Sequence, residues 1–403
     1  MSKRAHGDGG IDKRPDGTPY RIRYRVNGER FSKAFSGTIA EAKRELRALI
    51  RSGDTGEHIA PDRLTLGAWI DQWIEAGAPG RKKKRVGQRT LERYEQLLRV
   101  HVKPALGHRP LQQMKAIEID KLYADIEAKA GLAPLTRHHI HTVFSACLAT
   151  AERKGLVAAS PMKRVEQVPS ANEVDHGEAL EEEDLRKLVA GFRQHADFPI
   201  VALAAATGAR RNELFALRWS DLNSPAKTLR IERALERTKK FGLRFKPPKT
   251  KRGLRTIALD DGTIDLLLQA RAKLQRLKTG IPDGADVDLS LVRLPDDALM
   301  FPAVPERGCN FDFGAPRNPE YFTKSFAYWA GKLGFEGFHF HHFRGTHATL
   351  LLDKLVPVHV VAERIGDDPA VLLRNYAKRK RKATANMSVS GVIDALASGF
   401  LKL

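Results

Sequence analysis

Residues 207–214 read Thr-Gly-Ala-Arg-Arg-Asn-Glu-Leu and follow an apolar stretch that starts at Phe198. The apolar stretch predicts a helix that breaks at Gly208, where a new helix starts. Arg210 then sits at the start of the new helix, where free backbone N–H groups add to its guanidinium in binding an oxyanion. Glu213 can hold the Arg210 side chain in place. A purely structural Arg–Glu pair is the alternative.

A second motif, Phe-His-His-Phe-Arg, ends at Arg344. On a helix, the i, i+3 spacing places His341 and Arg344 on one face. Four histidines gather here, which raises a zinc hypothesis, but no cysteine cluster completes a site and the adjacent arginine disfavours a cation. We therefore expect no metal and no cofactor. The four histidines are His339, His341, His342 and His347.

A third motif, Val-Leu-Leu-Arg-Asn-Tyr, ends at Tyr376 and is followed by Ala377 and five basic residues. Pro369 fits the first turn of the helix that carries it, and Asp368 fits the cap. A tyrosine at an apolar helix period is more often a core residue than a catalyst, so the interpretation of Tyr376 depends on the other motifs.

A fourth motif is Pro-Pro-Lys-Thr, which contains Lys249 and precedes a predicted strand.

In order along the chain, these motifs resemble the tyrosine recombinase and phage integrase family: Arg-x-x-Glu after Thr-Gly, the lysine, His-x-x-Arg, and a tyrosine 32 residues beyond Arg344. Each motif alone is weak, whereas four in the family's order are specific. The two preceding segments look like the family's arm-binding β-sheet domain and its helical core-binding domain. The resemblance therefore spans nearly the whole chain.

The resemblance implies a site-specific recombinase that cleaves and rejoins DNA through a covalent 3′-phosphotyrosine, integrating or excising a mobile element. It makes Tyr376 the nucleophile, Arg210 and Arg344 the clamps on the scissile phosphate, Lys249 the general acid to the leaving 5′-oxygen, and His341 an aid to proton transfer. A bidentate guanidinium matches two phosphate oxygens better than an ammonium does. Clustered cations favour the phenoxide of a tyrosine, whose unperturbed pKa is about 10.

Asp367 departs from the family's pattern. It lies nine residues before Tyr376, where the family usually has His and sometimes Trp. Because a carboxylate facing the scissile phosphate would repel it, we expect Asp367 to turn away and help Asp368 cap the next helix. Reduced activity is the alternative. His347, one turn beyond Arg344, is a candidate substitute for the missing side chain.

The composition agrees with a polyanionic partner. The chain has 403 residues and a formal net charge of +21, which fits DNA, RNA or an anionic membrane. A membrane is disfavoured because no run of about 18 apolar residues and no signal peptide occur, so we expect a cytoplasmic, DNA-associated protein in a bacterial host. Only Cys147 and Cys309 are present, which excludes a disulfide framework, and Cys147 fits a helical core position.

The first predicted domain, residues 1–60, is a three-stranded sheet with one helix. Apolar and basic residues alternate from Tyr20 to Val26, and Asn27-Gly28 predicts a hairpin that pairs Val26 with Glu29, Tyr24 with Phe31 and Tyr20 with Phe35. Thr38 and Glu41 form a capping box for the helix. Because no acidic partner is evident for the arginines of the other face, we favour DNA contact over a solvated face; they are Arg21, Arg23, Arg25 and Arg30.

The second predicted domain, residues 64–167, is helical and binds the core site of the DNA. Thr65 is expected to cap its first helix, and further helices are expected around Leu91–Leu98, Ile117–Ile126 and Ile140–Ala151. A basic run that cannot be buried lies between the first two helices and is expected to contact phosphates. The residues of this run assigned to DNA are Lys82, Lys83 and Lys84.

The third predicted domain, residues 177–403, is the catalytic α+β domain, so the fold class is multidomain and mainly α with α+β. Strands are expected at Thr228–Ile231, Leu243–Phe245 and Arg255–Leu259. The segment Gly280–Asn318 is rich in Asp, Pro and Gly and is expected to be a surface excursion. Linkers are expected at Asp54–Arg63 and Val168–His176.

The expected partner is double-stranded DNA with core-type and arm-type sites, bound by a homotetramer with possible accessory DNA-bending or directionality proteins. The apolar C-terminal stretch that begins at Val392 docks either on its own domain or on a neighbouring protomer. Two rival functions stay open: a type IB topoisomerase-like enzyme that relaxes DNA, and a catalytically impaired DNA-binding or regulatory protein on the same fold.

Overall fold

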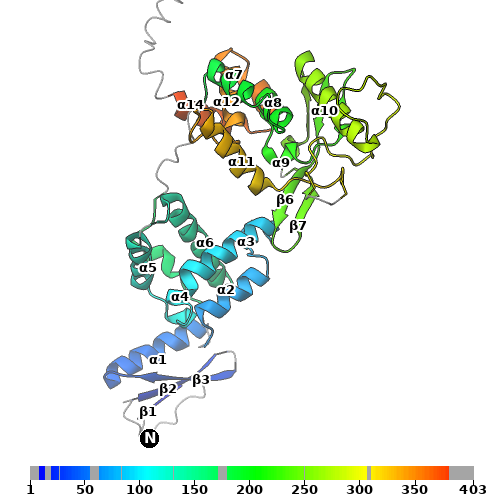
Figure 1. Ribbon diagram of the computed structural model, residues 1–403. Coiled ribbons are helices and arrows are strands. Elements are labelled where there is room, and N and C mark those ends of the chain that lie inside the picture. Colours follow the sequence, from blue (N-terminus) through cyan, green and yellow to red (C-terminus); the bar gives the residue numbers. More distant parts are fainter. Residues whose placement is uncertain are drawn as a thin grey trace, which may run out of the picture. The chain divides into compact units, whose positions relative to one another are not determined.

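The computed structural model divides into two compact units, Met1–Val174 and Asp175–Leu403, which Figure 1 shows in sequence colours. The expectations for Asn27, Lys83, Lys249 and Cys309, and for the C-terminal stretch, lie outside the described residues. The structure describes residues 9–13, 20–26, 28–54, 63–82, 84–129, 131–170, 179–248, 250–305 and 310–380.

The first unit begins with an antiparallel sheet in the order β1-β2-β3, covered on one face by α1 (Figure 1). The register is the predicted one, with Val26 opposite Glu29, Tyr24 opposite Phe31 and Tyr20 opposite Phe35. The alternation of β2 sends Ile22, Tyr24 and Val26 into the core. The capping box is confirmed, because Thr38 N donates to Glu41 Oε2 at 2.8 Å and Glu41 N donates to Thr38 Oγ1 at 3.3 Å. The elements are β1 Gly10–Asp12, β2 Tyr20–Val26, β3 Glu29–Phe35 and α1 Ile39–Asp54.

The same unit contains a helical bundle with its own core. Thr65 caps the first of these helices as predicted, since its Oγ1 accepts from Ala68 N at 3.2 Å. Cys147 is buried among the helices, and Trp69 Nε1 donates to its carbonyl oxygen at 3.2 Å. The helices are α2 Leu66–Glu75, α3 Gln88–Leu97 with a π-helical turn Leu98–Val102, α4 Lys103–Leu106, α5 Ala116–Ala128 and α6 Pro134–Arg153.

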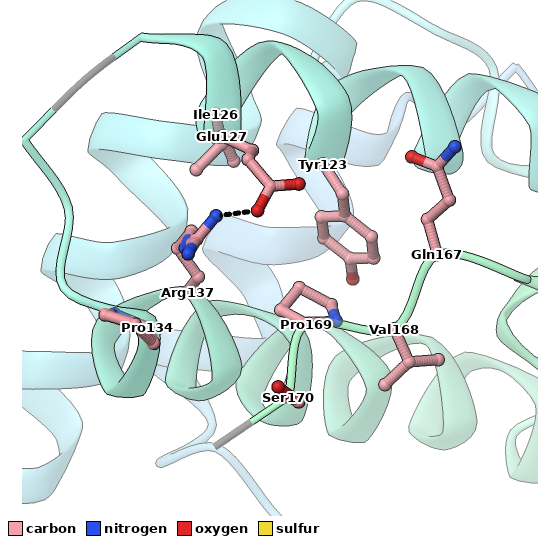
Figure 2. Close-up of a pocket in the computed structure, with 9 residues that line it drawn as sticks. All are labelled: Tyr123, Ile126, Glu127, Pro134, Arg137, Gln167, Val168, Pro169 and Ser170. Atoms are coloured by element: carbon pink, nitrogen blue, oxygen red, sulfur yellow. Dashed lines mark hydrogen bonds and ion pairs between the residues drawn. The ribbon is translucent and has the colours of Figure 1, made fainter. Parts of the chain in front are cut away.

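Residues 166–170, which include the start of the second predicted linker, pack onto this bundle. The backbone N–H groups of Glu166 and Gln167 both donate to Asp120 Oδ1 at 3.0 Å, and His138 Nδ1 lies 2.9 Å from the Pro169 carbonyl oxygen. A cavity of about 390 Å³ lies between α5, α6 and this segment. Figure 2 shows the residues that line it, with an ion pair between Glu127 and Arg137 on its wall. Residues 168–170 therefore belong to the helical domain's packing, and 171–178 lie outside the described residues.

The second unit combines helices with short antiparallel strands in the order β4-β5-β8 and a separate hairpin of β6 and β7. Its core is rich in phenylalanine, including Phe192, Phe215, Phe326 and Phe343. The strands are β4 Leu222–Asn223, β5 Thr228–Ile231, β6 Ala234–Thr238, β7 Gly242–Lys246 and β8 Arg255–Ala258. The helices are α7 Glu182–Gly191, α8 Phe198–Thr207, α9 Arg211–Leu214, α10 Asp261–Thr279, α11 Pro319–Lys332, α12 His342–Asp353, α13 Val358–Ile365 and α14 Pro369–Lys380.

The interpretation of Gly280–Asn318 as a surface excursion is wrong for residues 298–301. Ala298, Leu299 and Met300 are buried, and Met300 N donates to the Leu217 carbonyl oxygen at 2.8 Å. The high content of Asp, Pro and Gly in the segment gave no indication of this short apolar run. The backbone N–H groups of Leu299 and Met300 donate to carbonyl oxygens of residues that are distant in the sequence. Among the described residues, no helix is long and apolar enough to cross a membrane.

Candidate active site

Arg210 is held at a sharp change of chain direction between α8 and α9. Gly208 ends α8 with φ of 62°, and a Cβ there would lie 2.9 Å from the His347 ring, so glycine is needed for both reasons. Arg210 follows in an extended conformation as the residue that begins α9. The predicted position of Arg210 at a helix start is confirmed.

Glu213 fixes the Arg210 side chain, as expected. Its Oε1 accepts from Arg210 Nη1 at 2.9 Å, and its Oε2 accepts from Arg210 N at 3.0 Å and from Arg255 Nη2 at 2.9 Å. Burial opposes ionisation of this carboxyl, but Arg255 and Arg210 outweigh it and lower the pKa of Glu213. Glu213 is therefore an ionised, buried anchor that leaves Arg210 half-exposed.

Arg255 contributes to the site but was missed from the sequence. It lies on an inward-facing position of β8 and is buried, and its Nε donates to the Arg364 carbonyl oxygen at 2.8 Å. An arginine at an inward position of an alternating strand was the only signal that could have found it.

Arg344 is buried in α12 and ties together chain segments that are far apart in sequence. Its Nη1 donates to the Gly208 carbonyl oxygen at 3.3 Å and also to the Ile365 carbonyl oxygen, so it satisfies the ends of α8 and α13. Burial and the charge of Arg210 lower the pKa of Arg344 to about 10, against the opposing effect of Asp367. It remains protonated at neutral pH, and its Nη2 donates to the partly exposed Asp367.

The expectation that Asp367 turns away from the arginines is wrong. Its Oδ2 accepts from Arg344 Nη2 at 2.9 Å and lies 3.9 Å from Arg210 Nη2. The reason is electrostatic, because two adjacent guanidiniums attract Oδ2. The expected contact with Asp368 is nevertheless present, since Oδ1 of Asp367 accepts from Asp368 N at 3.1 Å. Burial opposes ionisation, but Arg344 and then Arg210 prevail, and the pKa of Asp367 is lowered. Asp368 caps α14 through Oδ1, which accepts from Ala370 N at 2.9 Å.

His347 does not stand in for the missing histidine. It is buried, its Nε2 accepts from Arg364 Nε at 3.1 Å, and its Nδ1 lies 2.9 Å from the Ala205 carbonyl oxygen. These contacts require the neutral ring with the proton on Nδ1, and burial together with Arg364 lowers the pKa of His347 to about 4. Its role is to join α12 to α8.

His341 lies at the start of α12 and is exposed. It lines a cavity of about 320 Å³ together with Arg210, Thr323, His339 and Phe340. The structure thus brings His341 and Arg210 to one opening, as the motif order implies. In the part of the chain that the structure describes, no group of three or more His, Cys, Asp or Glu side chains could hold a metal ion.

Tyr376 lies on α14 and is half-buried. Its hydroxyl donates to Asp353 Oδ1 at 2.9 Å, at the C-terminal end of α12. The contact joins the candidate nucleophile to the helix that carries Arg344. Lys249 lies outside the described residues, and its role as general acid stays a prediction.

The arginines on the outer face of the N-terminal sheet differ in their partners, whereas the sequence predicted four arginines without an acidic partner. Arg23 pairs with Asp12 of the neighbouring strand at 2.7 Å, which corrects the expectation that no acidic partner is present. Arg21 Nη2 donates to Ser32 Oγ at 3.3 Å, and Arg25 lies directly opposite Arg30 in the register. In the helical domain, the side chains of Lys82 and Lys84 are exposed.

The second unit thus presents two guanidiniums around one anion position, with a histidine at the same opening and a tyrosine on the last described helix. The model of the phage integrase family matches residues 178–382, and that of the phage integrase N-terminal SAM-like domain matches residues 65–126. The chain therefore belongs to the phage integrase family and is a site-specific recombinase of the tyrosine type.

Individual relatives agree with this assignment. An integrase of Saccharopolyspora erythraea is 25% identical over 390 residues, covering 83% of this chain and 84% of the relative. The Tn1549 transposon integrase, solved with circular intermediate DNA, has a TM-score of 0.62 at 16% identity and covers 84% of this chain and 100% of that one. A lambda integrase tetramer bound to a Holliday junction has a TM-score of 0.53 at 16% identity, and the match covers 89% of this chain and 95% of the lambda integrase chain.

Proposed function

We propose that this recombinase cleaves and rejoins DNA through a covalent 3′-phosphotyrosine on Tyr376, to integrate or excise a mobile element. The observation that supports it most is the convergence of Arg344 Nη2 and Arg210 Nη2 on one carboxylate oxygen, at 2.9 and 3.9 Å. Two guanidiniums that face one anion position can bind the non-bridging oxygens of a phosphodiester.

In this proposal each side chain has one role. Arg344 and Arg210 neutralise the charge that builds on the phosphate in the transition state, and Glu213 keeps Arg210 aimed at it. Tyr376 attacks phosphorus, Lys249 protonates the leaving 5′-oxygen, and His341 assists proton transfer. The phosphotyrosine conserves the energy of the broken bond, so rejoining requires no nucleotide cofactor.

The partner in this proposal is double-stranded DNA. Residues 1–60 bind arm-type sites through the arginine face, residues 64–167 bind the core site, and residues 177–403 carry out catalysis. The net charge of +21 favours such binding. The Tn1549 and lambda integrases were solved on DNA, the latter also as a tetramer, which supports a homotetramer on DNA for this chain. Accessory DNA-bending proteins are a further part of the proposal.

The decisive experiment uses the full chain and a nicked duplex that carries the core site, taken from the sequenced junctions of the integrated element. The wild type is expected to form an SDS-stable protein–DNA adduct, whereas Tyr376→Phe binds the duplex equally in a mobility-shift assay and forms none. No adduct with the wild type would favour the impaired DNA-binding protein. Relaxation of supercoiled plasmid that lacks the core site would instead favour the topoisomerase-like enzyme.

A further inference from the structure

The carboxylate of Asp367 occupies the position that the proposed function assigns to the scissile phosphate. We propose that Asp367 is a built-in competitor for that phosphate: it fills the anion position between Arg344 and Arg210 in the DNA-free protein, and a correctly placed DNA phosphate displaces it. The inference rests on the proposed function, which makes these two arginines the phosphate clamp.

The contacts of the arginines define this position. Arg344 Nη1 is committed to the carbonyl oxygens of Gly208 and Ile365, while its Nη2 donates to Asp367 at 2.9 Å. Arg210 Nη1 is committed to Glu213, while its Nη2 donates to the Gly366 carbonyl oxygen at 3.3 Å and lies 3.9 Å from the same Asp367 oxygen. Arg344 Nη2 therefore binds the carboxylate directly and Arg210 Nη2 lies beside it, and these are the two groups nearest to an anion at this position.

Asp367 cannot share this position with a phosphate. It is ionised at neutral pH, because Arg344 and Arg210 lower its pKa against the effect of burial. An ionised carboxylate only accepts hydrogen bonds, so it cannot donate to a phosphate oxygen as the family's histidine or tryptophan can. Two anions at one pair of guanidiniums repel each other, and one has to leave.

The structure provides room for the displaced side chain. Asp367 lines a cavity of about 350 Å³ between β8 and α13, together with Arg252, Thr256 and His359. The backbone of Asp367 is fixed, since its N–H donates to the Ala362 carbonyl oxygen at 2.9 Å. The cavity is also lined by Glu363, while Arg252 pairs with Asp368 and Asp367 Oδ1 accepts from Asp368 N at 3.1 Å. Displacement by a phosphate therefore moves the carboxylate from the guanidiniums toward the Arg252 side of this cavity, away from Glu363. Asp367 thus lowers the affinity for any phosphate that brings no further contacts.

The test compares Asp367→Asn, an isosteric neutral change, with Asp368→Asn, which removes one charge from the neighbouring residue but keeps a capping side chain. The probe is inorganic phosphate at constant ionic strength, and the readout is the rise in the melting temperature of the full chain. We expect phosphate to stabilise Asp367→Asn with a dissociation constant about 10-fold or more below that of the wild type, since a charged hydrogen bond changes an equilibrium by roughly that factor. Asp368→Asn should match the wild type.

A double variant locates the bound phosphate. Adding Arg344→Gln to Asp367→Asn should abolish the increase in phosphate affinity, because the phosphate then lacks its principal hydrogen-bond donor. An equal response of Asp367→Asn and the wild type, an equal gain in Asp368→Asn, or a gain that survives Arg344→Gln would each overturn the proposal.

Cleavage gives an independent measurement. With the nicked core-site duplex, Asp367→Asn and Asp367→His should reach half-maximal adduct formation at a lower DNA concentration than the wild type, without a lower maximal rate. A lower maximal rate would overturn the proposal, because it would give the carboxylate a positive role. If no variant forms an adduct, the proposed function fails, while the phosphate experiment still decides whether Asp367 is a competitor.

Discussion

The hydroxyl of Tyr376 donates a hydrogen bond of 2.9 Å to Oδ1 of Asp353, so the candidate nucleophile rests against a carboxylate at the end of the helix that carries Arg344. Before the hydroxyl can attack a phosphate, this bond must be broken or exchanged. The negative charge of Asp353 also repels an approaching phosphate. Both effects slow the first step of cleavage.

Replacing Asp353 by Asn is therefore expected to raise the rate of adduct formation by about 2- to 5-fold, a small factor because the pair is exposed. The rate is measured in single-turnover reactions with the nicked duplex. Glu182→Gln is the control, because Glu182 pairs with the adjacent Lys354 and not with Tyr376. A slower reaction in Asp353→Asn would mean that Asp353 accepts the proton of Tyr376.

Replacing Arg344 by Lys is expected to lower the cleavage rate about 100-fold or more, since a single ammonium cannot reach the carbonyl oxygens and the phosphate together. The same change should destabilise the second unit by about 1.5–3 kcal/mol, the contribution of one hydrogen bond to a charged group. Arg276→Lys is the matched control. Arg276 lies in α10, donates to the carbonyl oxygens of Pro282 and Ala285 beyond the end of that helix, and does not touch the site. Near-normal cleavage by Arg344→Lys would contradict the clamp.

Replacing Glu213 by Gln is expected to destabilise the second unit by about 3–5 kcal/mol, because it leaves Arg255 buried without its charge partner. The folded-state pKa of Glu213 lies below the ordinary value of 4.5. Its contribution to stability is therefore present above that value and is lost as the pH falls through the folded pKa. The stability difference between wild type and variant should shrink in this acid range and stay constant at neutral pH.

The control for Glu213 is Glu236→Gln, which removes the charge of a buried carboxylate that pairs with the partly exposed Arg244 and Lys246 in the β6–β7 hairpin. Urea unfolding of both variants, with adduct formation measured beside it, separates the two roles. Glu213→Gln should lose both stability and cleavage, whereas Glu236→Gln should lose only stability. Equal losses of cleavage would argue against a positioning role for Glu213.

Local signals predicted the local parts of this fold. The register of the N-terminal hairpin followed from the Asn27-Gly28 turn and the alternation before it, and the cap of α2 followed from Thr65. The place of Arg210 at a helix start followed from a glycine break, and the pairing of Glu213 with it from their spacing. Each of these depends on residues within a few positions of one another.

The parts that the sequence concealed depend on contacts between distant segments. Arg255 joins β8 to the carbonyl oxygen of Arg364, and Oδ2 of Asp367 accepts from Arg344, which is 23 residues earlier in the chain. Neither contact has a local pattern, because each partner is placed by the packing of separate helices. The burial of Leu299 inside a segment rich in Asp, Pro and Gly was hidden for the same reason.

His347 provides a pH-dependent test of that packing. The ring is buried and neutral, with a folded-state pKa of about 4, below the ordinary value of 6.5. The unfolded chain therefore binds a proton that the folded chain does not between these two values, so stability is full above pH 6.5 and falls as the pH drops toward 4. The total effect is on the order of 3 kcal/mol.

Replacing His347 by Gln is expected to remove this dependence, because an amide can both donate to Ala205 and accept from Arg364 without titrating. The full chain is unfolded with urea at several pH values between about 7.5 and 4, the range over which stability is expected to fall. The readout is the urea midpoint of hydrogen exchange in the proteolytic peptides that cover α12. His359→Gln, a change of the same kind at an exposed position of α13, should retain the wild-type dependence. If His347→Gln also retains it, then His347 is not the group whose protonation opposes folding, and the tautomer assigned to it is wrong.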